Sequence, residues 1–173
     1  LSLRRQRQMC IRDRGNVWAT DANGNDTVLG LSTGGRGHQV LKFSPQGELL
    51  LTLGKAGVAG NGPDTFDRPT DVAVSRNGDI FVTDGHGTNN RVVKFTDDGQ
   101  FIMSWGNTGY GPGEFRALHA IDMDSRGRIF VGDRSNNRVQ IFDQDGKHQA
   151  TWTQFGRPSG IAFDDSGQTV SYT

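Results

Sequence analysis

The sequence has little of what would mark a membrane, disulfide-stabilised or strongly charged protein. No window approaches the roughly 18 consecutive apolar residues of a membrane-spanning helix. The 173 residues include one cysteine and 5 prolines, only 33% are hydrophobic and 9% are aromatic, and the formal net charge is zero. The N-terminal segment is basic but lacks the apolar stretch and cleavage site of a secretory signal. Apolar residues are therefore spread too thinly for long core helices.

Glycine is abundant instead. It accounts for 25 of the 173 residues, which is about twice its usual share. Because glycine adopts positive φ without steric cost, it is the residue that tight turns require. The composition therefore favours short strands joined by many turns, and predicts an all-β fold.

The two ends of the chain could be encoded by complementary DNA strands. Residues 9–13, MCIRD, can be encoded by ATGTGTATAAGAGAC, whose complementary strand translates as VSYTH, and the chain ends in VSYT at 170–173. We therefore predict that 1–14 and 170–173 are non-native, adapter-derived segments, and we exclude them from the fold analysis. Without them the chain has 14 basic and 18 acidic residues, a net charge of −4, and no cysteine. Cysteine usage then gives no information on the redox compartment.

An internal repeat organises the remainder of the chain. Gly78 and Gly127 are 49 residues apart, as are Asp84 and Asp133. Such a period is typical of stacked repeat architectures, in which each copy is one supersecondary unit. The copies predict one domain over 15–169, with blades roughly at 15–54, 66–106 and 115–152 and the start of another at 155–169.

Each complete copy contains four short apolar runs separated by turn residues. In the second copy the runs read DVAVS, DIFVTD, RVVKFT and FIMSWG. The dipeptides at 77–78 (NG) and 98–99 (DG) are those that two-residue hairpins prefer. Four antiparallel strands in a repeat of about 40–50 residues are typical of a β-propeller blade. We therefore predict a propeller fragment of about three four-stranded antiparallel blades, which must stack because one blade cannot bury both of its faces.

These motifs resemble a known family. The pattern P-x-x-[VI]-A-V, then G-x-I-F-V-x-D, then N-x-R-V-x-x-F, resembles the NHL repeat over nearly all of 15–167. Within that group, GHQVLKFSPQGELLLTLG, RPTDVAVSRNGDIFVTDG and FRALHAIDMDSRGRIFVGDRSNNRVQIFD are similar, in the same order, to the peptidyl-α-hydroxyglycine α-amidating lyases. That resemblance implies a six-bladed ring, of which this chain would be about half. It also implies a carbon–nitrogen lyase that releases a peptide amide and glyoxylate.

His119 is the candidate metal ligand. It lies where the first strand of its blade is expected to begin, close to the axis of the ring. The resemblance implies that one histidine from each of three blades holds zinc (calcium is the other metal considered), and that His119 is one of the three. The matching positions in the neighbouring blades are Thr70 and Ser159, and the other two ligands would lie outside this chain. From the residues alone, a single histidine on an inner strand is more often a hydrogen-bonded channel residue than a metal ligand, and only the resemblance gives the two interpretations equal weight.

His86 is the candidate catalytic base. It lies in the loop DGHGTNNR, which joins the second and third strands of its blade and should share a rim with His119. The resembled lyases carry a tyrosine in this loop, which here is one residue longer. An imidazole is a suitable base near neutral pH, so the chemistry could be kept, changed or lost. The alternative is a solvated loop histidine. His38 should approach the same face, and His148 should be exposed on an outer strand.

Other motifs have structural interpretations. Because Asp84 and Asp133 recur with a following Asn-Arg pair, we expect them to satisfy turn amides and cross-strand contacts rather than to catalyse. We expect the tryptophans to wedge blades together. The Gly-rich stretches 57–66 and 109–115 lack the Lys-Ser/Thr ending of a phosphate loop and are predicted to be crossovers between blades.

The leading functional hypothesis is a metal-dependent lyase acting on a peptide or small molecule at the top face of the propeller. The alternative is a non-catalytic NHL propeller that binds a protein or peptide on that face. The net charge of −4 and the absence of a Lys/Arg cluster outside 1–14 argue against nucleic acid. The resemblance favours a secreted or periplasmic location, whereas the residues themselves leave the compartment unknown.

Overall fold

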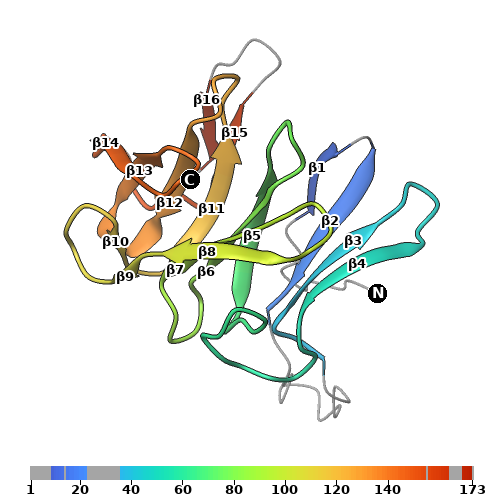
Figure 1. Ribbon diagram of the computed structural model, residues 1–173. Helices are drawn as coiled ribbons and strands as arrows, with labels where there is room; N and C mark the ends of the chain where they lie inside the picture. Colours follow the sequence, from blue (N-terminus) through green and yellow to red (C-terminus); the bar gives the residue numbers. More distant parts are fainter. Residues whose placement is uncertain (1–8, 14, 23–35, 155, 164–168, 173) are drawn as a thin grey trace, which may run out of the picture.

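A computed structural model describes residues 9–13, 15–22, 36–154, 156–163 and 169–172. These residues form three four-stranded antiparallel sheets and two two-stranded sheets, and within each sheet every strand pairs with the next along the chain. The sheets lie side by side like the blades of a fan (Figure 1). The predicted all-β propeller architecture is therefore confirmed.

The blades follow one another in sequence. Their strands are β1 (Met9–Asp13), β2 (Asn16–Asp21), β3 (Gln39–Phe43) and β4 (Leu49–Gly54); β5 (Pro69–Val74), β6 (Ile80–Asp84), β7 (Arg91–Phe95) and β8 (Phe101–Trp105); β11 (Leu118–Met123), β12 (Ile129–Asp133), β13 (Arg138–Phe142) and β14 (His148–Trp152); and β15 (Gly160–Phe163) with β16 (Thr169–Tyr172). The short strands β9 (Asn107–Thr108) and β10 (Glu114–Phe115) pair in parallel in the crossover after β8, and one 3₁₀ turn, η2 (Arg134–Asn136), follows β12.

The segments predicted to be non-native contribute to the outermost sheets. β1 lies within 1–14 and pairs with β2, while β16 overlaps 170–173 and pairs with β15. Backbone pairing of this kind is open to almost any extended sequence, since it uses only amide and carbonyl groups. The adapter origin of these segments therefore stays a prediction.

The hydrophobic core lies between blades rather than within them. One cluster joins Trp18, Val40 and Leu53 of the first blade to residues of the second, such as Val72 and Val82. Alternate residues of the second blade point the other way, so a second cluster joins it to the third blade, and a third cluster joins the third blade to β15. This follows from the period-two alternation of strands. As the sequence predicted, each blade is buried by its neighbours.

Aromatic side chains fill these interfaces. Trp105, on the outer strand of the second blade, lies 6.3 Å from the Phe81 ring of its own blade. It lies 6.0 Å from the Phe142 ring of the next blade. The predicted wedging role is confirmed for this tryptophan.

Buried carboxylates join consecutive inner strands. Asp71 on β5 accepts the backbone N–H of Ile121 on β11 at 3.0 Å. Asp122 on β11 accepts that of Phe163 on β15 at 2.9 Å. Burial raises the pKa of Asp71 to about 7. Each of these blades is thus tied to the next near the axis by a charged or titratable group.

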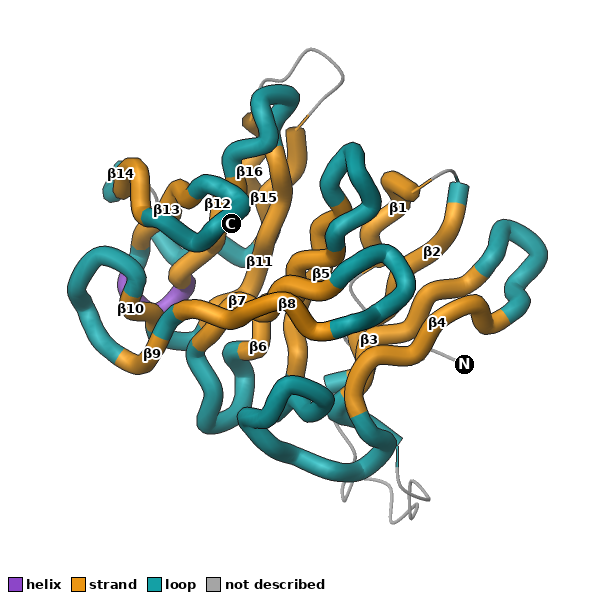
Figure 2. Tube along the Cα trace, viewed as in Figure 1, coloured by secondary structure: helices purple, strands orange, loops and turns teal. Residues whose placement is uncertain are grey.

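Two rims result from this meander. The β6–β7 and β12–β13 loops and the crossovers between blades share one rim, and the β6–β7 loop and the 55–68 crossover lie at the lower end of the view in Figure 2. The tight turns at 75–79 and 124–128 lie at the other. No helix among the described residues is long and apolar enough to cross a membrane.

Candidate active site

Two histidines from different blades meet at the crossover rim. His86 lies in the β6–β7 loop and His119 is the second residue of β11. Their ring centroids are 4.7 Å apart and the ring planes are inclined by 68°. The two residues that the sequence singled out, 33 positions apart, are therefore in direct ring contact.

The His86 loop is held by backbone contacts with the start of its own blade and of the next. His86 N donates to Arg68 O at 3.3 Å, and Gly87 N donates to Asp67 O at 3.1 Å. Gly85 packs so closely that a Cβ there would lie 2.7 Å from the backbone nitrogen of Leu118, the residue before His119. Only glycine permits this approach, which places the neighbouring imidazole against His119.

The orientation of His119 follows from one hydrogen bond. Its Nδ1 lies 3.0 Å from the backbone oxygen of Ser159 in the next blade. A carbonyl oxygen can only accept, so Nδ1 carries the proton and Nε2 has the free lone pair. Fixing one ring nitrogen on a carbonyl in this way is the arrangement found around metal-binding histidines.

Arg134 is a site residue that the sequence reasoning missed. Its Nε is buried and has no hydrogen-bond partner among the described residues. Burial, the His119 ring and the charges of Arg134 and Arg68 lower the pKa of His86 to about 4. Burial and Arg134 also lower the pKa of His119. Both imidazoles are therefore neutral at pH 7, beside a guanidinium whose Nε has no hydrogen-bond partner in the described part of the chain.

A signal for Arg134 was present in the repeat. The position 49 residues earlier is Gly85, so the third blade carries a charged residue where the second carries glycine. Such a departure from the repeat, directly after the recurring Asp84 and Asp133, marks a residue that the blade itself does not need.

His38 approaches this rim, as expected, but has a structural contact there. Its Nδ1 accepts the backbone N–H of Arg68 at 3.3 Å and lies 3.8 Å from an oxygen of Asp67. His148 differs from the expectation of an exposed residue. It is half-buried because its ring packs against Phe142, with centroids 5.5 Å apart.

The repeated Asp and Arg residues form structural clusters, as predicted. Asp133 accepts from Asn136 at 2.8 Å and from Arg138 Nε at 2.7 Å. Its other oxygen accepts the backbone N–H of Arg116 at 2.8 Å. Asp84 makes the equivalent three bonds in the second blade. These groups hold the crossovers to the blades through hydrogen bonds.

The donor set for a metal is incomplete within this part of the ring. Among the residues that the structure describes, no group of three or more His, Cys, Asp or Glu could hold a metal ion. His119 fits as a single nitrogen ligand, because its Nε2 is unprotonated and its ring is fixed. A nitrogen ligand suits zinc, whereas calcium takes oxygen ligands.

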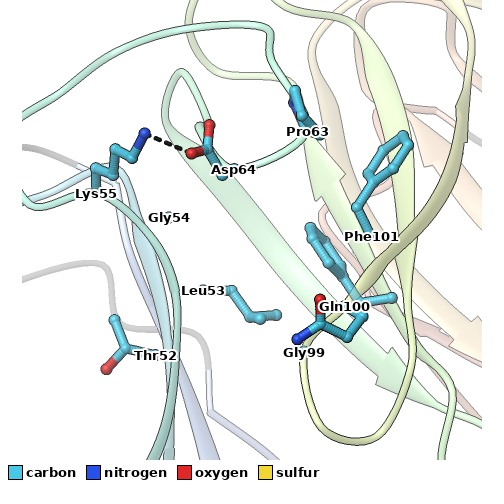
Figure 3. A pocket seen from close by; sticks show the side chains of 10 residues that line it. Thr52, Leu53, Gly54, Lys55, Pro63, Asp64, Gly99, Gln100 and Phe101 are labelled. Atoms are coloured by element: carbon cyan, nitrogen blue, oxygen red, sulfur yellow. Dashed lines mark ion pairs between the residues drawn. The ribbon is translucent and has the colours of Figure 1, made fainter.

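A separate groove lies away from the histidines, between the outer strands of the first two blades. Its volume is about 300 Å³, and its walls include Leu53, Phe95 and Phe101 (Figure 3). Lys55 and Asp64 form an ion pair at its edge. No histidine lines this groove, so it does not form part of the candidate site.

Comparison with known proteins agrees with the repeat and the fold. A family described as a six-bladed β-propeller matches residues 66–146. Human NHL repeat-containing protein 3 is 37% identical over an alignment of 161 residues, and the match covers 88% of this chain and 44% of that protein. The peptidyl-α-hydroxyglycine α-amidating lyase 1 of Drosophila melanogaster is 39% identical over 139 residues, covering 73% of this chain and 23% of the fly protein. The chain thus spans less than half the length of these curated relatives.

Solved structures show the same fold at low sequence identity. A gluconolactonase from Xanthomonas campestris superposes with a TM-score of 0.67 at 17% identity, over 95% of this chain and 52% of that one. A chain of a nidogen/laminin complex superposes with a TM-score of 0.63 at 20% identity, over 90% of this chain and 51% of that one.

Proposed function

We propose that this protein, whose chain carries NHL-type repeats of a six-bladed β-propeller, is a carbon–nitrogen lyase. It would split a peptidyl-α-hydroxyglycine into a peptide amide and glyoxylate. The observation that carries the proposal is the contact of His86 with His119, at 4.7 Å between ring centroids, beside the unpaired Nε of Arg134. Similarity to amidating lyases over 73% of the chain supports the choice of reaction.

Each residue has a role that its environment permits. His119 would supply one nitrogen ligand through Nε2, since Nδ1 is held by the Ser159 carbonyl. A bound zinc ion would polarise the oxygens of the substrate. Arg134 would bind the carboxylate of the α-hydroxyglycine residue, since a guanidinium whose Nε has no partner among the described residues is the group in this site best suited to a carboxylate.

His86 would carry the proton. Its neutral imidazole takes the proton of the substrate hydroxyl while the C=O bond of glyoxylate forms and the C–N bond breaks. The bonding electrons leave on the amide nitrogen, and the proton returns from His86 to that nitrogen. The products are a peptide amide and glyoxylate, so no atom is gained or lost.

Glyoxylate release from a peptidyl-α-hydroxyglycine by the complete propeller tests the proposal. We expect His86→Ala to reduce the rate at least about 100-fold, because general acid–base groups contribute on that order. His119→Ala should also reduce it strongly, because it removes a metal ligand. His86→Tyr, which restores the residue of the resembled lyases, should retain more activity than His86→Ala. His148→Ala, on an outer strand, is the matched control. Absence of glyoxylate from a folded, zinc-loaded protein would refute the proposal.

A second function is a non-catalytic propeller that binds a peptide or protein on the same rim. The presence of His86 where the resembled lyases carry tyrosine favours it. In that case peptides would bind without turnover, and His86→Tyr would not produce activity.

A further inference from the structure

Two arginines occupy the same position of the repeat on either side of the His119 blade. Arg68 directly precedes Pro69 at the start of β5, and Arg157 directly precedes Pro158 shortly before β15. In the blade between them this position is Ala117. Both arginines are exposed. They therefore stand at the crossover rim, one blade to each side of His119.

Each arginine is tied through the backbone to one of the two histidines. Arg68 has φ 64°, and its carbonyl accepts the N–H of His86 at 3.3 Å. The carbonyl of Arg157 accepts from Ser159 Oγ at 3.4 Å. The carbonyl of Ser159 in turn binds Nδ1 of His119 at 3.0 Å. The backbone of each arginine is therefore held by hydrogen bonds close in the chain to a contact of His86 or His119.

Neither guanidinium is in a close ion pair with another described residue. Arg91 and Arg138 are paired with buried aspartates, at 3.1 and 2.7 Å. Within the described parts of the chain, no carboxylate lies within 4.0 Å of the guanidinium nitrogens of Arg68 or Arg157. Asp67, the nearest in sequence, accepts instead from the backbone and hydroxyl of Thr88. Arg68 and Arg157 are thus exposed at this rim without a close carboxylate among the described residues, and Asp67 interacts with Arg68 only at longer range.

We propose that Arg68 and Arg157 select substrates with a second negative charge, an acidic side chain on the residue that precedes the α-hydroxyglycine. This inference rests on the proposed function, in which Arg134 binds the first carboxylate. A guanidinium binds a carboxylate with two parallel hydrogen bonds, so an aspartate or glutamate at that position is the matching chemistry. Because both arginines are exposed, the selectivity should weaken with added salt.

The test compares two acylated peptides that end in α-hydroxyglycine and differ only in Asp or Asn before it. We expect the complete protein to have a kcat/KM about tenfold higher for the Asp peptide at low salt. Arg68→Gln and Arg157→Gln should each reduce this preference about threefold, and the double variant should abolish it. The quantity compared is the ratio of the rates for the two peptides, because Arg68 also lowers the pKa of His86 and its loss changes both rates together. Arg68→Lys should keep most of the preference.

Matched controls exist at the opposite rim. Arg76 and Arg126 are exposed arginines in the tight turns after β5 and β11, and their replacement by Gln should leave the preference unchanged. Equal activity of the wild type on both peptides would overturn the proposal. So would an equal loss for both peptides in Arg68→Gln and Arg157→Gln.

Binding of the glycine-extended forms of the two peptides separates this proposal from the lyase. These peptides lack the hydroxyl and cannot be cleaved, so their Kd is independent of turnover. Preferential binding of the Asp form, lost in the double variant but not in the controls, would support the charge selection even if no glyoxylate were released. Glyoxylate release with no Asp preference in binding or in turnover would support the lyase and refute the charge selection.

Discussion

Nδ1 of His38 accepts the backbone N–H of Arg68, in the next blade, at 3.3 Å. One blade further on, Oδ1 of Asn90 accepts the N–H of Ala117 in the same way, at 2.8 Å. Arg68 and Ala117 both have positive φ, at 64° and 52°. An imidazole in the first blade thus replaces an amide of the repeat as the acceptor that holds a crossover in the left-handed region.

Replacement of His38 tests this equivalence. His38→Ala removes the acceptor of a backbone N–H and should reduce the free energy of unfolding by about 1 kcal/mol. His38→Asn should be nearly neutral, because Asn offers the same acceptor and tolerates the φ of 60° at this position. Chemical denaturation of the two variants measures both values. Equal destabilisation by Ala and Asn would contradict the assignment.

Gly85→Ala should affect the site more than the fold. The added Cβ would meet backbone nitrogen of Leu118 at 2.7 Å, so the loop must move outward and carry His86 away from His119. If the lyase proposal holds, we expect a loss of about 10- to 100-fold in kcat, because small misplacements of a reacting group are costly. Gly156→Ala is the control, since a Cβ there meets nothing within 4 Å. Unchanged kcat in a well-folded Gly85→Ala protein would show that the ring contact is not needed.

Two arginine–aspartate pairs should differ in their contribution to stability. Arg138, whose side chain is 12% exposed, pairs with fully buried Asp133, and Arg138→Leu would leave that carboxylate unpaired. Loss of such a partner costs about 3–5 kcal/mol. Arg128 is 39% exposed and pairs with Asp124, which is also buried but accepts the backbone N–H groups of Arg126 and Arg128. Because solvent screens this pair, Arg128→Leu should cost less than Arg138→Leu. Thermal or chemical unfolding compares them. Similar losses would show that Asp133 is satisfied without its arginine.

Asp71 predicts a pH dependence of stability. Burial raises its folded-state pKa to about 7. The backbone N–H groups of Ile121 and Val72, which donate to the carboxylate, lower the pKa and oppose part of this rise. Asp122 raises it further. Between about pH 4 and pH 7 the folded state keeps a proton that the unfolded state releases, so stability falls as pH rises through this window and levels off above it.

The size of this effect can be measured with one variant. A displacement of the pKa from its usual value to about 7 corresponds to about 4 kcal/mol over the window. Asp71→Asn cannot titrate, so its free energy of unfolding should change less between pH 4 and pH 7 than that of the wild type. Identical slopes for the two proteins would assign the pH dependence to other groups.

The fold was predictable from the sequence because the same blade motif recurs several times along the chain. The recurrence of Asp84 and Asp133, and of glycines in the turns, fixed the strand order and the blade stacking. It also identified the Asp and Arg clusters as structural, since a catalytic group has no reason to recur in each blade.

The site was predictable only in part. Meander topology indicated that His86 and His119 share a rim, but not that their rings touch, because this depends on the close approach of Gly85 to Leu118. Arg134 was missed because its role depends on what surrounds it after folding. The half-buried position of His148 likewise follows from ring packing against Phe142, which strand alternation does not reveal.

The carboxylates on the inner strands have a consequence for how the molecule opens. Asp71 and Asp122 each satisfy a backbone N–H that belongs to the following blade. A fluctuation that detaches one blade therefore exposes donors and acceptors on both sides of the break, as well as the hydrophobic interface. The cooperative unit then spans neighbouring repeats, and hydrogen exchange of the amides of Ile121 and Phe163 should report the separation of blades rather than local fraying.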